Sequence, residues 1–366
     1  MWKTAAPADT VRARRQSGNR VTHRVFDPRD DTDARAVDVL LTDGTTSVLD
    51  TTPDQALALG ALLPEPTAGS DEPVRWVHYP WRRTLVRVLG PVGFRRLRLD
   101  RNRDKLTLDE QRRALDLRVG VVGLSVGHAV AHTLALEGLC GELRLADFDQ
   151  LELSNLNRVP ATVFDLGVNK SVVAARRIAE VDPYLTVRTF PTGIDDAVID
   201  DFLDGLDVVV EECDSVDAKF LVRERARARG IPVIMETSDG GVLDVERYDL
   251  DGERPFFHGL LGDLDRAGLA RLTAPERAGL APRILGAESI TPRMAASLPH
   301  IGTSLSTWPQ LAGDVALGGA SVAAVVRAFV RGEAPASGRL RVGLDAALAH
   351  LEDPLSSGAG SPAAER

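Results

Sequence analysis

One stretch, from residue 119 to residue 170, constrains the fold more than any other. A short run of branched apolar residues, Val119 to Val122, leads into a turn at Gly123. A helical segment of small residues follows, and a second apolar run, Leu143 to Ala146, ends in Asp147. Apolar strand, glycine turn, helix and apolar strand make one βαβ unit. An acid about 20 residues beyond the glycine turn is where dinucleotide-binding folds hold a ribose hydroxyl.

The alternation of strand and helix continues beyond residue 170. Repeated alternation of this kind predicts an α/β fold, a Rossmann-like, doubly wound and mostly parallel sheet with helices on both faces. The predicted strands are 186–190, 207–211, 232–236, an antiparallel 242–248 and a final 338–344, and the predicted helices are 129–139, 171–181, 197–203, 218–229 and 316–331. Residues 260–299 contain several prolines and predict an irregular, partly helical segment.

The pattern divides the chain into three parts. Residues 1–98 are predicted to form a small N-terminal α+β extension of unknown role, and residues 99–345 the main α/β domain. Residues 346–366, rich in Ser, Gly, Pro and Ala, are predicted to be a disordered tail.

Within the extension, residues 36–50 predict a hairpin that turns at Asp43-Gly44, and residues 55–63 predict a helix. Residues 76–99 mix aromatic residues with arginines and predict an amphipathic helix that docks its aromatic side chains on the main domain. A further helix is predicted from Thr107.

Charge and composition narrow the class of partner. A net charge of -9 argues against nucleic acid and against an anionic membrane. No apolar run of about 18 residues and no signal-peptide pattern is evident, so we expect a cytoplasmic protein with no membrane partner. The two cysteines, Cys140 and Cys213, provide neither a disulfide framework nor a four-cysteine zinc site.

The glycine turn also matches a motif of another enzyme class. Residues 123–127, Gly-Leu-Ser-Val-Gly, fit the G-x-S-x-G nucleophile elbow of α/β-hydrolases, and they lie between a predicted strand and a predicted helix. A hydrolase would then need an acid and a histidine later in the chain, and His258 and His300 are the candidates. That hypothesis leaves the polar residues after Asp147 without a role.

Those polar residues form an ordered series. It begins at Asp147-Phe148-Asp149, continues through residues 154–158 (Ser-Asn-Leu-Asn-Arg) and Lys170, and ends at Asp214, which closes a later strand. ATP adenylation needs positive charge on the triphosphate while pyrophosphate leaves. Arg158 can grip two phosphate oxygens at once, and Lys170 is a mobile point charge suited to the α-phosphate. Asp214 lies where a carboxylate could hold Mg²⁺ beside the nucleotide crevice.

The series closely resembles the ATP-binding signature of the ThiF/MoeB/HesA family, the bacterial relatives of ubiquitin-activating enzymes. The resemblance covers roughly residues 101–331 and is strongest between Asp147 and Asp214. Departures from the family pattern are Val159 for glutamine, Ser215 and Lys219 for asparagine and arginine, and Ser125, Val126 and His128 in a turn with fewer glycines. The altered turn followed by SNLNRV resembles an actinobacterial branch of the family.

The resemblance implies an adenylation site that binds ATP and Mg²⁺. The catalytic residues it implies are Arg158, Lys170, Asp214 and Arg103, with Asp214 holding the metal ion. The nucleotide-binding residues it implies are Gly123, Ser125, Val126, Asp147, Asp149, Ser154, Asn155, Arg158, Lys170, Asp214 and Ser215. From the residues themselves, Asp147 suits the ribose hydroxyls and Asn155 a phosphate oxygen.

Partners follow from the same resemblance. It implies a homodimer, in which an arginine before the first strand reaches the active site of the other subunit, and Arg103 is favoured over Arg101. The implied substrate is a carboxylate, such as the C-terminus of a ubiquitin-like sulfur-carrier protein or another peptide. No cysteine follows Cys213, so the thioester that some relatives form in a later loop is not expected. A nitroreductase-like flavin domain is a partner in the branch that the turn resembles.

Two other functions remain open from the sequence. One is a non-catalytic nucleotide-binding or dimerisation scaffold, which the residues at positions 126 and 128 favour. The other is an NAD(P)-dependent oxidoreductase, which the βαβ unit alone suggests and which leaves Arg158, Lys170 and Asp214 unexplained.

Overall fold

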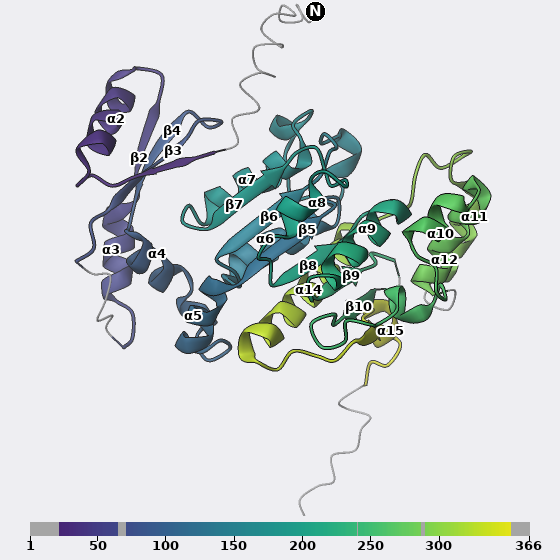
Figure 1. Ribbon diagram of the computed structural model, residues 1–366. Coiled ribbons are helices and arrows are strands. Elements are labelled where there is room, and N and C mark those ends of the chain that lie inside the picture. Colours follow the sequence, from purple (N-terminus) through teal and green to yellow (C-terminus); the bar gives the residue numbers. More distant parts are fainter. Residues whose placement is uncertain (1–21, 65–70, 240, 287–289, 353–366) are drawn as a thin grey trace, which may run out of the picture.

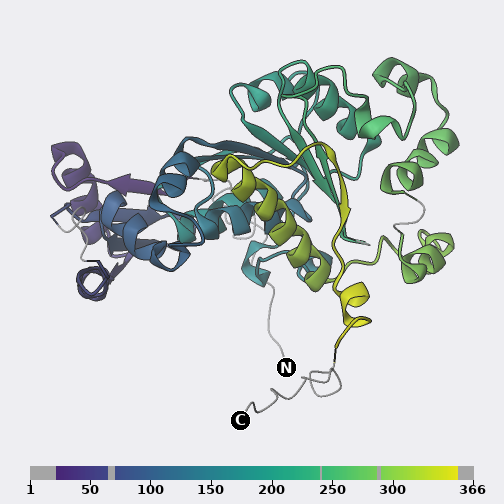
Figure 2. The ribbon, with the colours of Figure 1, turned by 90° about the horizontal axis from the view of Figure 1, so that it is seen from below.

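The computed structural model describes residues 22–64, 71–239, 241–286 and 290–352, and these hold a four-stranded and a seven-stranded sheet. The small sheet lies at one end of the molecule and the irregular segment after residue 250 at the other (Figures 1 and 2). The first 21 residues and most of the predicted tail lie outside the described residues. Where the tail was expected to begin, the short helix α15 (Leu344–Leu348) forms instead.

The seven-stranded sheet confirms the predicted α/β fold. Its strand order is β11-β10-β9-β8-β5-β6-β7. The five strands from β9 to β7 are parallel, whereas β10 pairs antiparallel with both β9 and β11. The order reverses at β5, so β5, β6 and β8 meet where an open α/β sheet leaves a crevice. The strands are β5 (Arg118–Val122), β6 (Glu142–Ala146), β7 (Thr186–Phe190), β8 (Val208–Glu211), β9 (Val233–Glu236), β10 (Val242–Glu246) and β11 (Gly338–Arg341).

Helices cover both faces of this sheet, as a doubly wound fold requires. One core contains Val121 and Leu145 together with residues of α6, α7 and α14, and the other contains Val209 and Met235 with residues of α8 and α9. The helices are α6 (Gly127–Glu137), α7 (Lys170–Val181), α8 (Ile199–Leu203), α9 (Val216–Arg227) and α14 (Ala312–Arg331), with the short turns η2 (Leu153–Asn155) and η3 (Val163–Asp165) between β6 and α7.

Helix α14 is long and apolar enough, by length and composition, to span a membrane, which the sequence analysis did not anticipate. Half of its most apolar window is buried in the protein, where it packs on α6 and on the sheet. Val322 and Val326 are fully buried in that core.

The segment between β10 and α14 is irregular and partly helical, as predicted. Helix α10 packs against α9 and the turn η4 against β10, and the segment lies to one side of the sheet (Figure 2). They are η4 (Phe256–Gly259), α10 (Arg266–Arg271), α11 (Ala274–Ala278), α12 (Leu280–Leu285), α13 (Pro292–Ser297) and η6 (Leu298–His300).

The N-terminal extension is α+β, but two of its predicted elements are wrong. Residues 36–50 form the end of a helix and a strand rather than a hairpin. The Asp30 side chain accepts hydrogen bonds from the Thr32 and Asp33 amides, which starts helix α2 (Asp31–Thr42) early, and Val37 packs beside Phe26 and Leu85. Strand β2 (Ser47–Asp50) then pairs in parallel with β4.

Residues 76–99 form a hairpin and a helix rather than one amphipathic helix. Strands β3 (Arg75–Tyr79) and β4 (Thr84–Val88) pair around a turn in which Arg83 has a φ of 49°. Val77 and Tyr79 are buried at alternate positions, which is the period of a strand. The remaining elements are β1 (Arg24–Phe26), α3 (Thr52–Gly60), α4 (Pro91–Arg98), η1 (Asp100–Asn102) and α5 (Leu108–Asp116), and the small sheet has the order β1-β3-β4-β2.

The aromatic residues of the hairpin dock on the main domain, as predicted. The Tyr79 hydroxyl donates to the Ala179 carbonyl at 3.0 Å, and Trp81 Nε1 donates to Glu180 at 2.6 Å. Both acceptors belong to α7, whose first residue, Lys170, is among the predicted site residues. The extension therefore braces a helix that also contributes to the candidate site.

Candidate nucleotide-binding site

The structure gathers all but one of the predicted site residues at the carboxyl ends of β5, β6 and β8. The glycine turn follows β5, the Asp147–Arg158 series follows β6, and Asp214 follows β8. Lys170 opens α7, which returns to the same edge because its amide donates to the Asp149 carbonyl at 2.8 Å. Residues far apart in the sequence thus share one edge of the sheet (Figure 1).

The glycine turn is fixed by its neighbouring strands. The Gly123 amide donates to the Ala146 carbonyl at 2.9 Å, and the Leu124 amide donates to Asp147 Oδ2 at 2.6 Å. Gly123 has a φ of +84°, and a Cβ there would lie 2.5 Å from the Glu212 carbonyl oxygen. The close approach of β5 to β8 therefore requires glycine at this position.

Replacing Gly123 by alanine is expected to destabilise the protein by ~2–4 kcal/mol, because it adds both φ strain and a clash with backbone. Gly167→Ala is the matched control: Gly167 has a φ of +78° but nothing lies within 4 Å of its Cβ position. Urea unfolding should give a loss of only ~1 kcal/mol for the control, since strain acts there alone. Equal losses for the two variants would show that Gly123 is not tightly packed.

The Asp147 side chain stabilises the glycine turn by accepting hydrogen bonds from backbone amides. Its two carboxylate oxygens accept the amides of Leu124 and Asp149, at 2.6 and 2.8 Å, and burial raises the pKa of the Asp147 carboxyl. Asp149 is half exposed, and its carboxylate accepts Lys170 Nζ at 2.8 Å. Of the two acids, Asp149 presents its carboxylate to solvent.

Arg158 lies across the glycine turn. Its Nη2 and Nε donate to Ser125 Oγ at 2.9 and 3.2 Å, and its Nη1 donates to the Asn157 side chain at 2.9 Å. Asp214 acts electrostatically on the Arg158 guanidinium, so the end of β8 is also close. A half-buried cation thus faces a serine hydroxyl at the start of α6.

Three other predicted residues have local structural contacts. Asn155 Oδ1 accepts the Glu152 amide at 2.9 Å and closes the turn η2. Ser215 is the N-cap of α9, and the exposed Ser154 lies beside Glu152. These contacts hold the loops that carry Arg158 and Asp214.

Asp214 is an exposed carboxylate at the end of β8, and no hydrogen bond or ion pair of its side chain is found among the described residues. Mg²⁺ is commonly held by one or two carboxylates together with substrate phosphates. A group of three or more metal-ligating side chains is likewise not found in the described part of the chain. Asp214 thus fits as the protein ligand of a metal ion whose other ligands come from a bound nucleotide.

The residues that replace glycines in the turn point into the protein. Val126 and His128 are buried, and neither ring nitrogen of His128 has a hydrogen-bond partner among the described residues. Burial lowers the pKa of His128 to about 3, and the neighbouring His132 adds to this effect. His128 is therefore neutral near pH 7 and adds no charge to the turn.

The buried imidazole predicts a specific loss of stability in acid. The unfolded chain takes up a proton below the ordinary histidine pKa of 6.5, whereas folded His128 does not until about pH 3, so stability falls as pH decreases from 6.5. At pH 5 this difference is worth about 2 kcal/mol. His128→Leu should remove that loss in urea unfolding at pH 5 and pH 8. The exposed His350→Leu serves as control, and parallel curves for His128→Leu and wild type would contradict the assignment.

The structure adds contacts to this edge that the sequence did not indicate. Asn157 Nδ2 donates to the Gln310 carbonyl at 2.9 Å, and Gln310 Nε2 donates to Ser238 Oγ at 3.1 Å. The segment before α14 therefore reaches the edge that carries Arg158. A single glutamine in an irregular segment offers no pattern from which this contact could be predicted.

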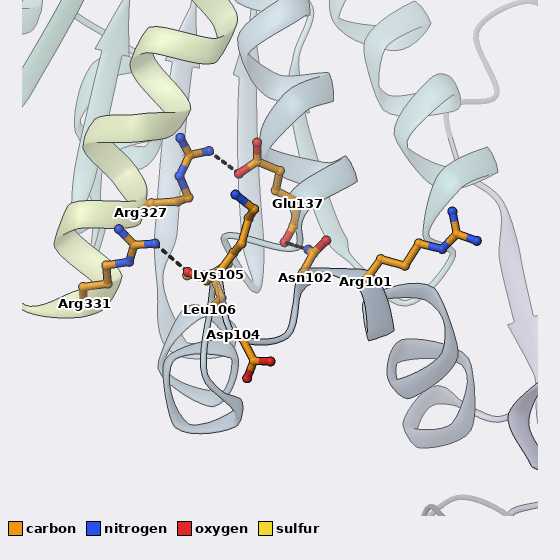
Figure 3. Close-up of a pocket in the computed structure, with 8 residues that line it drawn as sticks. All are labelled: Arg101, Asn102, Asp104, Lys105, Leu106, Glu137, Arg327 and Arg331. Carbon is orange, nitrogen blue, oxygen red and sulfur yellow. Dashed lines mark hydrogen bonds and ion pairs between the residues drawn. The ribbon is translucent and has the colours of Figure 1, made fainter. Parts of the chain in front are cut away.

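Arg103 lies apart from the other predicted residues. It pairs with Asp100 at 2.8 Å near the far end of α6, an 11-residue helix that rises about 16 Å from the glycine turn. A cleft of about 600 Å³ lies there, in which Asn102 and Arg327 contact Glu137 while Arg101 points away (Figure 3). Within one chain, neither Arg103 nor Arg101 joins the candidate site.

The contacts around Ser125 differ from those of a hydrolase. Ser125 Oγ accepts Arg158, whereas His258 pairs with Asp244 at 2.8 Å. A hydrogen bond between the Ser125 hydroxyl and a histidine ring is not found among the described residues. Cys213 is partly buried, and burial raises the pKa of its thiol, which disfavours a nucleophilic thiolate.

Comparison with known proteins identifies the domain. Residues 99–276 match the ThiF family. An uncharacterised protein of Mycobacterium tuberculosis is 52% identical over 326 residues, which are 89% of this chain and 46% of that protein. A sulfur carrier protein adenylyltransferase of Thermus thermophilus is 28% identical over 178 residues, 48% of this chain and 56% of the relative.

The chain spans about half the length of these curated relatives. Among solved structures, a tRNA N6-threonylcarbamoyladenosine dehydratase of Escherichia coli is 19% identical, with a TM-score of 0.47 and coverage of 67% of this chain and 98% of that one. The family match spans the glycine turn, the Asp147–Arg158 series, Lys170 and Asp214. Residues 99–276 of this chain are therefore similar to the ThiF family.

Proposed function

We propose that this chain is an ATP-dependent adenylyltransferase that activates a carboxylate as an acyl-adenylate. The observation that carries the proposal is the meeting of Arg158, Lys170 and Asp214 at the carboxyl ends of the central strands, around a glycine turn. Two cations and one free carboxylate at this edge are what a Mg-ATP adenylation site needs.

Each residue has a role in the proposed reaction. A substrate carboxylate oxygen attacks the α-phosphorus of ATP, the bond from that phosphorus to the bridging oxygen breaks, and pyrophosphate leaves. Arg158 and Lys170 neutralise the charge that develops on the phosphates, and Lys170 would leave Asp149 to do so. Asp214 would hold Mg²⁺, which supplies further charge neutralisation on the phosphates. The sequence favours Asp147 for the ribose hydroxyls, but both oxygens of Asp147 accept backbone amides, so we assign this role to the exposed Asp149 instead.

The substrate we propose is a peptide or protein C-terminus, such as that of a ubiquitin-like sulfur carrier. The name of the Thermus thermophilus relative, a sulfur carrier protein adenylyltransferase, supports a carrier of this kind. With no cysteine after Cys213, the activated group would pass to its acceptor without an enzyme thioester in a later loop.

We further propose a cytoplasmic homodimer. Arg103 lies about the length of α6 from the site of its own chain, so the role that the resemblance implies for it would require the site of a second copy. A nitroreductase-like flavin domain remains the proposed further partner.

Nucleotide binding by calorimetry tests the proposal. Wild type is expected to bind Mg-ATP and not NADH, and Asp214→Ala should abolish the dependence of binding on Mg²⁺. ATP–pyrophosphate exchange with candidate carboxylates then searches for the substrate. Failure to bind ATP would favour the second candidate, a non-catalytic scaffold, which the buried Val126 and His128 in the turn support. Binding of NADH alone would favour an oxidoreductase.

A further inference from the structure

Glu211, the last residue of β8, has a fully buried carboxylate that three donors share. Its Oε1 accepts the Cys213 amide at 2.7 Å and Lys219 Nζ at 3.0 Å. Its Oε2 accepts Arg223 at 2.7 Å. The carboxylate is therefore tied both to the turn that carries Asp214 and to helix α9.

Lys219 stands where the family signature has an arginine, in the helix that follows Asp214. Its ammonium contacts both oxygens of Glu211, at 3.0 and 3.2 Å, and its side chain is 14% exposed. This ammonium is held in the interior, and no ion pair of Asp214 is found among the described residues, although the Arg158 guanidinium is near enough to act on it electrostatically. An ammonium on Asp214 would compete with a metal ion for the same oxygens.

A second acid fixes the other side of this arrangement. Arg223 is fully buried and donates from Nε to Glu246 at 2.6 Å, and Glu246 also accepts the Phe257 amide at 2.6 Å. Glu211 and Glu246 are thus equally buried partners of one guanidinium. Only Glu211 contacts the Asp214 turn and Lys219, so Glu246 provides a matched control.

We propose that Glu211 is a positioning residue for metal binding: it retains Lys219 in the interior and fixes the Cys213 amide, which leaves Asp214 free to hold Mg²⁺. This inference rests on the proposed function, because it assumes that Asp214 holds the metal ion of Mg-ATP.

The test measures ATP binding by calorimetry at a series of Mg²⁺ concentrations. Glu211→Gln retains an oxygen for the Cys213 amide but releases Lys219, and it should raise the half-saturating Mg²⁺ concentration ~10-fold. The double variant Glu211→Gln/Lys219→Met should return it to within ~2-fold of wild type, because the competing ammonium is gone. Glu246→Gln should leave it unchanged, although both acid variants lose stability in urea.

Equal shifts in Glu211→Gln and Glu246→Gln, or no rescue by Lys219→Met, would reduce Glu211 to a structural role. Lys219→Met alone keeps the test decisive if Glu211→Gln does not fold. It should leave the half-saturating Mg²⁺ concentration unchanged or lower it, and a higher value would overturn the proposal. If wild type did not bind Mg-ATP at all, the proposed function would be wrong as well. If wild type bound Mg-ATP normally and the variants did not differ from it, only the role of Glu211 would be wrong.

Discussion

In the proposed adenylation site, Arg158→Ala is expected to weaken Mg-ATP binding at least ~10-fold and to lower pyrophosphate exchange ~10²-fold or more, because it removes a charged donor that would face the phosphates. The guanidinium contacts Ser125 Oγ and the Asn157 side chain, both at 2.9 Å, and it is only partly buried. Its loss should therefore have little effect on the free energy of unfolding, although it removes the positive charge that lies beside the glycine turn. Calorimetry and ATP–pyrophosphate exchange measure the two effects.

The control for Arg158→Ala is Arg112→Ala. The Arg112 side chain is 74% exposed on α5 and pairs only with Asp109 among the described residues, so it should bind nucleotide as wild type does. Ser125→Ala distinguishes the effect of the Ser125 hydroxyl from that of the Arg158 guanidinium, because it removes the hydroxyl and retains the guanidinium. If Arg158→Ala bound Mg-ATP normally, the adenylation site would have to lie elsewhere.

Glu236→Gln is expected to reduce a loss of stability that wild type shows as the pH rises from about 4.5 to about 8. Glu236 closes β9 in the interior, its amide donates to Glu212 Oε1 at 3.1 Å, and its Oε2 has no hydrogen-bond partner among the described residues. Burial raises the pKa of Glu236 to about 8, with a smaller effect from Asp314. A Cβ on Gly318 of α14 would lie 2.2 Å from Oε2, so no room remains for solvent on that side.

The sign follows from the raised pKa. Between the ordinary glutamate pKa of 4.5 and about 8, the folded protein holds a proton that the unfolded chain has released, so stability falls as pH rises through this window. The full loss is on the order of 5 kcal/mol. Urea unfolding at pH 5, 7 and 9 should show a smaller loss for Glu236→Gln than for wild type. The neighbouring Glu212, whose pKa burial also raises, still contributes in the variant. The exposed Glu333→Gln is the control, and an unchanged pH profile in Glu236→Gln would place the proton on Glu212 instead.

The local patterns of the main domain were sufficient to predict its fold. Apolar runs such as Leu143 to Ala146 are buried in a parallel sheet, and helices such as α7 show the period of a helix over 12 residues. These elements bury one or both faces regardless of what lies beside them, so periodicity alone identifies them. The sequence likewise places Asp147, Arg158, Lys170 and Asp214 after the ends of predicted strands or at the start of a predicted helix, so their position at one edge of the sheet could be predicted.

The extension and the fine structure of the site depended on contacts between distant residues. Trp76, Val77 and Tyr79 belong to a strand because β1 and β4 flank them, and a single segment does not reveal its neighbours. Whether a carboxylate accepts hydrogen bonds within the protein or remains open to a ligand also depends on contacts between distant residues. Asp147 is taken up by backbone amides, whereas Asp214 remains open.

The sequence by itself determined the α/β fold, the glycine turn and the set of charged residues that one edge of the sheet could bring together, because periodicity and strand ends are local properties. Only the tertiary structure decided that Lys219 pairs with Glu211, that Gln310 reaches Asn157 and that Arg103 lies at the far end of α6. The physical reason is that hydrogen bonds and ion pairs are short-ranged, so their partners are known only once packing has placed them.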